Sequence, residues 1–169
     1  MYWGGFEHSV DEKGRVIIPS KFRYQLGQVF IITKGLDHCL FVLDAEYFRT
    51  AFLDKVRQLA FLDKNSIMLQ RFFCAEAVDA SVDNQGRVAI PANLRNWANI
   101  DLQSEVMING MTNHVEIWSK PLWRSYMDNM EEDALIAAAE AAGVGRGLLT
   151  AAEVLPPHDA HVASSPSQA

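Results

Sequence analysis

Short apolar segments separated by glycine-bearing turns recur between residues 8 and 118, and their β-branched residues favour strands. The pattern predicts strands at 8–10, 16–18, 29–33 and 39–43, and again at 106–109 and 114–118. The first two of these segments flank Asp11-x-x-Gly14-Arg15, which predicts a hairpin. Pro19 and Pro91 should each end a strand, because proline cannot donate to a ladder. Short helices are predicted to follow at 20–26 and 92–98.

Longer helices are predicted after each block of strands, with Asp44 and Ser119 as suitable N-caps. Apolar residues then recur at helical spacing: Phe48, Phe52, Val56 and Leu59 in the first block, and Leu122, Trp123, Tyr126, Met127 and Met130 in the second. We interpret both stripes as core or subunit contacts rather than as a cofactor site. A further short helix is expected at 66–73, and an Ala-rich helix that leads to a disordered tail is expected from about residue 135.

The two blocks are copies of each other. Residues 11–23 align with residues 83–95 at an offset of 72, and Asp, Gly, Arg, Val, Ile, Pro and a final Arg are identical in both. After a slip of three residues the match continues, for example from Gly35 to Gly110 and from Val42 to Ile117. Two copies at this long period indicate a duplicated small domain with pseudo-two-fold symmetry. Because one such unit is too small to bury a sufficient core, we expect the copies to share strands in one barrel.

The overall charge, taken alone, argues against nucleic acid as a partner. The formal net charge is −6 and the isoelectric point is about 5.3, whereas phosphate contacts need local positive charge. The charge is unevenly distributed, however: residues 1–72 carry ten Lys and Arg against eight Asp and Glu, and residues 73–143 carry four against eleven. The first copy therefore has the basic side chains that DNA binding would need.

The repeated loop is the best candidate for chemistry. Its Asp and Arg lie four residues apart across a glycine, so the Asp can bond loop amides and also hold its Arg. One interpretation is a turn-stabilising salt bridge of little energetic value. The other is an arginine presented to guanine O6 and N7, with Lys13 and Lys21 on phosphates. Two copies in register favour the second interpretation.

These motifs resemble the MraZ family of AbrB-like swapped-hairpin transcription factors. The resemblance rests on 1–4, on both Asp-x-x-Gly-Arg segments with their Ile-Pro, on Arg71-Phe-Phe and on Val115-Glu-Ile-Trp-Ser-Lys120, and it covers roughly residues 1–135. It implies an α+β, mainly β fold in which two tandem units form one pseudo-symmetric β-barrel, with helices after each unit. The expected parts are a first AbrB-like unit at 5–48, a helical linker at 49–76, a second AbrB-like unit at 77–121, a C-terminal helix at 122–142 and a disordered tail at 143–169.

The resemblance also implies a function. It predicts a sequence-specific transcriptional regulator, expected to be a repressor, of the division and cell wall gene cluster. Such a regulator binds G-rich direct repeats of double-stranded DNA upstream of its own operon. The family signature maps onto Asp11 with Arg15 and onto Asp83 with Arg87, and the family's DNA-contacting loop maps onto Lys13 and Arg15. Together with the loop chemistry above, this predicts DNA contacts and loop-orienting residues; the former are Lys13, Arg15, Lys21 and Arg87, and the latter are Asp11, Gly14, Asp83 and Gly86. Asn84 and Gln85 replace Glu12 and Lys13, so the first loop should contribute more phosphate affinity.

A closed homo-oligomeric ring, which the resemblance also implies, reconciles the acidic charge with DNA binding, because several weak loops on one particle gain by effective concentration. We expect a cytoplasmic, nucleoid-associated protein. Apolar runs such as 29–32 are far below the roughly 18–20 residues that cross a bilayer, and the start of the chain lacks signal-peptide features. Two departures from the family are Glu76, a carboxylate beside the second unit, and the long tail.

Other classes of function fit less well. Two cysteines without CxxC spacing and five scattered histidines predict neither a metal site nor a cofactor, and no catalytic motif indicates an enzyme. An antitoxin-like or other protein-interaction module of the same superfamily stays open as an alternative. The duplicated unit argues against that alternative, and the tail keeps it possible.

Overall fold

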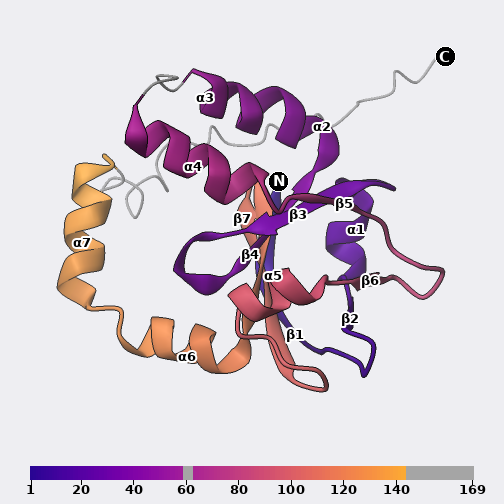
Figure 1. Cartoon of the computed structure of the whole chain (residues 1–169). Coiled ribbons are helices and arrows are strands. Elements are labelled where there is room, and N and C mark those ends of the chain that lie inside the picture. Colours follow the sequence, from indigo (N-terminus) through magenta and orange to yellow (C-terminus); the bar gives the residue numbers. More distant parts are fainter. Residues whose placement is uncertain (59–62, 144–169) are drawn as a thin grey trace, which may run out of the picture. The chain divides into compact units, whose positions relative to one another are not determined.

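The computed structural model describes residues 1–58 and 63–143, which fall into one compact unit, Met1–Asp128, and a second unit that begins at Asn129. The strands are β1 (Tyr2–Ser9), β2 (Arg15–Ile17), β3 (Phe30–Lys34), β4 (Leu40–Asp44), β5 (Val78–Ala80), β6 (Arg87–Ala89), β7 (Glu105–Thr112) and β8 (His114–Ser119). The helices are α1 (Ser20–Leu26), η1 (Leu36–His38), α2 (Ala45–Tyr47), η2 (Phe48–Phe52), α3 (Leu53–Arg57), α4 (Lys64–Cys74), α5 (Ala92–Trp97), α6 (Lys120–Asp128) and α7 (Glu132–Ala141). Figure 1 shows these elements, with α3 and α4 side by side.

The strands form a six-stranded sheet of order β1-β7-β8-β4-β3-β5 and a separate two-stranded ribbon of β2 and β6. All pairings are antiparallel. Since β1 to β4 correspond to β5 to β8 in the duplication, reversing the sheet order and exchanging the copies gives the same sheet. The arrangement therefore has the pseudo-two-fold symmetry that the repeat predicts.

The two copies exchange strands. β1 of the first copy pairs with β7 of the second, β5 of the second pairs with β3 of the first, and β2 pairs with β6. The predicted hairpin between residues 8–10 and 16–18 is therefore wrong: the turn between them forms, but both flanking strands pair with the other copy. The main expectation of a mainly β fold with helices holds. Within the described residues β1 and β5 do not pair to close the six-stranded sheet, so a closed barrel stays a prediction.

One core serves both copies. Equivalent residues of the two copies are buried in the same cluster, which includes Val16 with Val88, Ile18 with Ile90, Phe22 with Leu94, and Val42 with Ile117. A smaller cluster of Ile31, Leu43, Ala45 and Phe48 lies where α2 and η2 pack on the first copy. Asp44 caps α2 as predicted, since its carboxylate accepts from the Tyr47 amide at 2.8 Å. Because both copies contribute to one core, the two Asp-x-x-Gly-Arg loops that precede β2 and β6 are held in fixed positions relative to each other.

Helices occupy the regions after each copy, as the hydrophobic spacing predicts. α3, α4 and all of η2 except its first residue lie within the range 49–76 that is expected to be a helical linker. Where one helix is expected at 122–142, the structure has two: α6, which begins earlier, at Lys120, and α7. The expected tail, apart from Gly143, lies outside the described residues, as does Leu59. Of the helices in the described ranges, none is long and apolar enough to cross a membrane.

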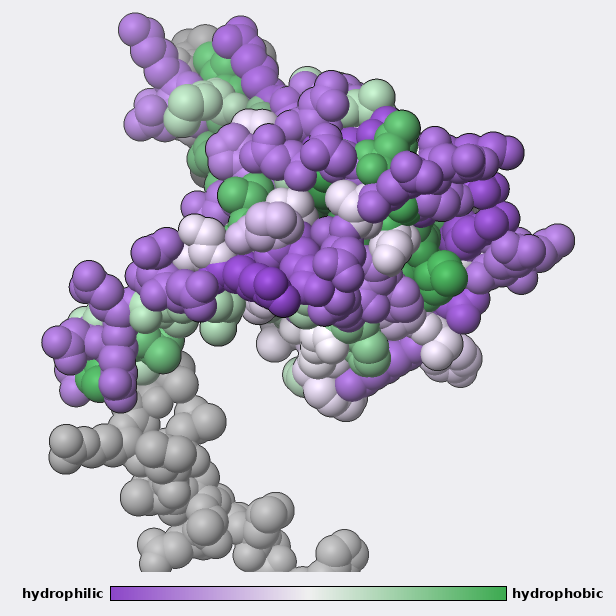
Figure 2. Space-filling view, turned by 90° about the horizontal axis from the view of Figure 1, so that it is seen from below, coloured by the Kyte–Doolittle hydropathy of each residue, from purple (hydrophilic) through white to green (hydrophobic). Residues whose placement is uncertain are grey.

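The face of the molecule seen in Figure 2 is covered mostly by hydrophilic side chains, and its hydrophobic side chains gather in small, separate patches. Large apolar residues that are nevertheless exposed include Trp3, Ile17 and Tyr24. Of these, Ile17 belongs to the two-stranded ribbon.

Candidate nucleic-acid interface

The two Asp-x-x-Gly-Arg loops have the same backbone geometry. In the first loop the Asp11 amide donates to the Arg15 carbonyl at 2.8 Å, and the Gly14 amide donates to the Asp11 carbonyl at 3.1 Å. In the second loop the corresponding distances, from Asp83 to Arg87 and from Gly86 to Asp83, are both 2.8 Å. Gly14 and Gly86 have φ of 73° and 77°, a left-handed conformation that strongly favours glycine. Both loops are thus tight, internally bonded turns.

Each loop aspartate holds both its own backbone and its arginine. Oδ1 of Asp11 accepts from the amides of Lys13 and Arg15, both at 2.9 Å. Oδ2 accepts from Nε of Arg15 and pairs with Nη2, both at 2.7 Å. Asp83 repeats this pattern with the Gln85 and Arg87 amides at 2.9 Å and with the Arg87 guanidinium at 2.7–2.8 Å. The carboxylate therefore fixes the direction in which the arginine leaves the loop.

These contacts keep both carboxylates charged. Hydrogen bonds from the Arg15 amide and side chain lower the pKa of Asp11 below its ordinary value, the amide bond having the larger effect. The Arg87 side chain and amide lower the pKa of Asp83 from 3.8 to about 2. At neutral pH both ion pairs are intact.

The ion pair leaves part of each guanidinium available. An arginine has five N–H donors, and the contact with the aspartate uses Nε and one hydrogen of Nη2. The outer edge, formed by Nη1 and the second hydrogen of Nη2, does not take part in the pair. That edge can still offer two parallel donors to a partner with two adjacent acceptors.

Strand exchange brings the two arginines onto one surface. In the ribbon, Arg15 lies opposite Ala89, Val16 opposite Val88, and Ile17 opposite Arg87. Val16 and Val88 are 1% exposed and face the core, so alternation turns the other four side chains to the opposite, outer face. Arg15 and Arg87 are diagonal neighbours on that face, a relation that typically separates residues by about 7–8 Å. We call the face formed by Arg15, Ile17, Arg87 and Ala89 the ribbon face.

Two further arginines adjoin the loops, and sequence reasoning assigned them no role. A Cβ on Gly14 would lie 2.9 Å from Nε of Arg95, and a Cβ on Gly86 would overlap the guanidinium of Arg23. Arg95 also donates from Nε to the Ile90 carbonyl at 3.2 Å. Each loop is thus covered by the arginine in the last turn of the short helix of the other copy. The sequence did offer one signal for these two residues, because the Arg that closes each aligned segment recurs at the offset of 72.

Lys13 and Lys21 have different surroundings. Lys13 is an exposed residue of the first loop. Lys21, on α1, holds its Nζ 4.1 Å from the centre of the Trp3 ring of β1. Among the described residues, no hydrogen bond or ion pair connects Lys21 with either loop. The structure therefore groups Lys13 with Arg15 but does not group Lys21 with them.

Glu76, the carboxylate noted as a departure from the family, links two elements near the second copy. It accepts from Lys34 Nζ of β3 at 2.5 Å and from the Asn93 side chain of α5 at 2.9 Å. Since α5 also carries Arg95, this contact helps to fix the helix from which the first loop is covered.

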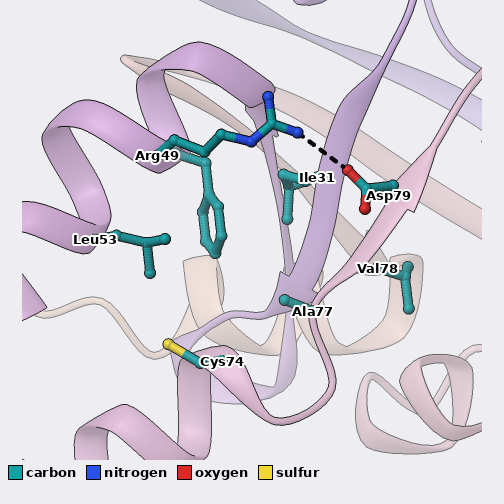
Figure 3. A pocket seen from close by; sticks show the side chains of 8 residues that line it. Ile31, Arg49, Leu53, Cys74, Ala77, Val78 and Asp79 are labelled. Carbon is teal, nitrogen blue, oxygen red and sulfur yellow. Dashed lines mark ion pairs between the residues drawn. The ribbon is translucent and has the colours of Figure 1, made fainter.

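A pocket of about 310 Å³ lies away from the ribbon face, between η2–α3 and the strands β3 and β5 (Figure 3). Its lining is mostly apolar, and Arg49 and Asp79 form an exposed ion pair at 3.5 Å. The Cys74 thiol also lines it, and burial raises the pKa of that thiol. These groups offer no nucleophile paired with a base. Residues 1–58 and 63–143 also bring no three His, Cys, Asp or Glu side chains together as a metal site.

Comparison with known proteins gives consistent matches. A family model described as "MraZ protein, putative antitoxin-like" matches twice, over residues 1–72 and 73–145. A "Transcriptional regulator MraZ" from Halothermothrix orenii is 42% identical over 146 residues, which are 85% of this chain and 100% of the relative. Proteins of the same name from Acetivibrio thermocellus and Thermoanaerobacter sp. are 45% and 46% identical, over 85% and 78% of this chain and 100% and 90% of the relatives. The two model matches coincide with the two sequence copies.

Proposed function

This chain belongs to the MraZ family, and from that premise we propose that it is a transcriptional regulator, not an enzyme, that binds double-stranded DNA with its ribbon face. Its relatives are named as transcriptional regulators, and that name designates no enzymatic activity.

The observation that carries the proposal is the pair of aspartate-held arginines on one exposed two-stranded ribbon. The major groove of B-DNA admits a β-ribbon, and guanine presents O6 and N7 there as two adjacent acceptors. The outer guanidinium edges of Arg15 and Arg87 match that acceptor pair. Because the aspartates already hold both side chains, little rotamer freedom is left to lose on binding.

Phosphate contacts come from the positive groups around the loops. Lys13 is exposed in the first loop, whereas Gln85 occupies the equivalent place in the second. Arg95 adjoins the first loop and Arg23 the second. We therefore assign the larger share of phosphate affinity to the first loop. Lys21, from its position over the Trp3 ring, would contact a DNA phosphate beyond those reached by the two protein loops.

The DNA target, the barrel and the ring that we propose are those that the family resemblance implies. The target is a set of G-rich direct repeats upstream of the protein's own operon in the division and cell wall cluster, and binding represses that operon. The interlaced copies are two AbrB-like swapped-hairpin units, 5–48 and 77–121, that form one barrel. Chains assemble into a closed ring that works at the nucleoid in the cytoplasm. A ring would let several loops act together despite the net charge of −6.

Fluorescence anisotropy tests the proposal directly. Purified protein is titrated against the DNA upstream of its own gene and against a scrambled duplex, at two salt concentrations. We expect preference for the upstream DNA, and binding that weakens with salt because counterions are released. Equal affinity for both duplexes at both salt concentrations would contradict sequence-specific binding.

Variants assign the contacts. Arg15→Ala should abolish specific binding and keep the fold, and Arg87→Ala should weaken specific binding, since a bidentate pair contributes about 1–3 kcal/mol of discrimination. Arg57→Ala is the matched control, because Arg57 forms a similar short-range pair with Asp54 on α3, outside the ribbon. Retained operator affinity in Arg15→Ala would refute the assignment. In sedimentation, a monomer at micromolar concentration would refute the ring.

An antitoxin-like interaction module is the second candidate, and the description of the matching family model favours it. Such a module would bind a partner protein in addition to DNA. A pull-down with full-length protein and with a variant that lacks residues 144–169 separates the two candidates. A partner lost with those residues would support the module.

A further inference from the structure

The ribbon face is symmetric in its arginines but not in the residues between them. Ile17 and Ala89 occupy equivalent positions of the two copies, two residues after Arg15 and Arg87, respectively. Their positions in the register are also equivalent, because Ile17 lies opposite Arg87 and Ala89 lies opposite Arg15. The two ends of the face therefore differ in size: a branched four-carbon side chain adjoins one arginine and a methyl group adjoins the other.

Ile17 is an unusual residue for this place. It is 42% exposed, although neighbouring β2 residue Val16 is buried in the shared core. It stands on the same outer face as both guanidinium groups, because strand alternation separates it from Val16. The exposed part of the Ile17 side chain is not stabilised by burial in the core. Its position beside two guanidinium groups suits a ligand that presents an apolar group next to hydrogen-bond acceptors.

We infer that Ile17 is a specificity-determining residue that packs against the C5-methyl group of a thymine adjacent to the guanine contacted by Arg87. This inference rests on the proposed function. In the major groove the thymine methyl is the apolar feature of the base edges, and it is presented in the same groove as the guanine acceptors. Ala89 is too short to make an equivalent contact beside Arg15. The face thus reads one guanine together with a neighbouring thymine and the other guanine alone.

The asymmetry gives the ribbon a direction. A ribbon with true two-fold symmetry would read both DNA strands alike and would favour an inverted repeat. Ile17 and Ala89 break that symmetry at the bases, and Lys13 and Gln85 break it at the phosphates. Each chain therefore binds its site in one orientation.

Selection from a duplex library tests the inference. The library keeps two guanines and randomises the base pairs next to each, and it is selected with wild type, Ile17→Ala, Ala89→Ile and the double exchange. Ile17→Ala should lower the preference for thymine beside one guanine about four- to fifteenfold, as expected for loss of one or two methyl-sized contacts. Ala89→Ile should create a preference beside the other guanine, and the double exchange should reverse the orientation of the selected site.

The control is Val29→Ala, because Val29 is a β-branched residue of similar exposure, 47%, that lies outside the ribbon. It should leave the selected sequences unchanged, and affinity for random duplex should be equal in all variants. Unchanged base preferences in both Ile17→Ala and Ala89→Ile, with specific binding still lost in Arg15→Ala, would overturn this inference and leave the proposed function standing. A changed subunit number in Ile17→Ala with unchanged base preferences would overturn it too, since Ile17 would then contact another copy. Absence of any selected sequence with wild type would instead overturn the proposed function.

Discussion

The ion pair between Asp83 and Arg87 makes the stability of the second loop depend on pH. The pKa of Asp83 is lowered from 3.8 to about 2 in the folded protein, first by the Arg87 side chain. A carboxyl whose pKa is lower in the folded state stabilises the fold above its unfolded pKa, and this stabilisation disappears as pH falls through the folded pKa. The contribution of Asp83 should therefore be complete at neutral pH and lost between about pH 4 and about pH 2.

Asp83→Asn tests this expectation. The free energy of unfolding of the variant should be lower than that of wild type by a constant amount from neutral pH to about pH 5, and the difference should shrink towards pH 2. Urea unfolding followed by circular dichroism at a series of pH values measures it. Glu12→Gln, which changes an exposed carboxylate of the other loop, serves as the control. A difference that stays constant down to pH 2 would show that the charge of Asp83 is not involved.

The loops and the helices were predictable because their determinants are local. Asp11, Gly14 and Arg15 specify a turn within five residues, and Pro19 followed by helical spacing specifies α1. Strand partners were not predictable in this way. Residues 8–10 and 16–18 have the composition of a hairpin, but pairing depends on contacts far along the chain, and a duplicated sequence offers each strand an equivalent partner in either copy.

The same limit applies to the candidate site. The Asp11–Arg15 pair follows from spacing alone, whereas the cover of Gly14 by Arg95 arises only because the copies are exchanged. The meeting of Arg15 and Arg87 on one face likewise requires the register of β2 with β6. The surroundings of Lys21 were not predictable either. It is close to the first loop in sequence, but α1 places its Nζ over the Trp3 ring.

The contact between α1 of one copy and the loop of the other predicts an energetic coupling. Gly86→Ala should destabilise the fold more than Gly14→Ala. Both changes place an L-residue at positive φ, at about 1–2 kcal/mol. The Gly86 methyl would overlap Nη1 of Arg23, and this overlap is more severe than that of the Gly14 methyl, which would lie 2.9 Å from Nε of Arg95. Nε of Arg23 is buried, which limits how far the side chain can move aside.

A double-mutant cycle with Arg23→Ala, measured by urea unfolding, isolates the contact. Gly86→Ala should be less destabilising in the Arg23→Ala background, with a coupling energy in the range of roughly 0.5–3 kcal/mol for residues in contact. The backbone part of the cost should persist in that background. Strict additivity of the two substitutions would mean that helix α1 and the second loop are not coupled.

Considered as a whole, the compact unit is held together across its two copies rather than within them. In the described residues four strand pairings join the copies, β1–β7, β2–β6, β3–β5 and β4–β8, and two, β3–β4 and β7–β8, lie within a copy. The main core takes equivalent residues from both. One copy alone would leave the inner faces of its strands exposed to water, and a unit of that length has little core of its own.

Separate fragments 1–72 and 73–143 should therefore fold together and not alone. At low micromolar concentration each fragment should lack a cooperative thermal transition by circular dichroism, because the apolar surface that it buries by itself is too small to offset its conformational entropy. An equimolar mixture should recover the strand content of the intact chain, a cooperative transition and a complex in size-exclusion chromatography that contains both fragments. A homodimer of one fragment would use the same cross-copy pairing, so the decisive comparison is with the monomer. If either fragment unfolds cooperatively as a monomer, the strands do not need the other copy, and the exchanged arrangement cannot be what holds Arg15 and Arg87 on one face.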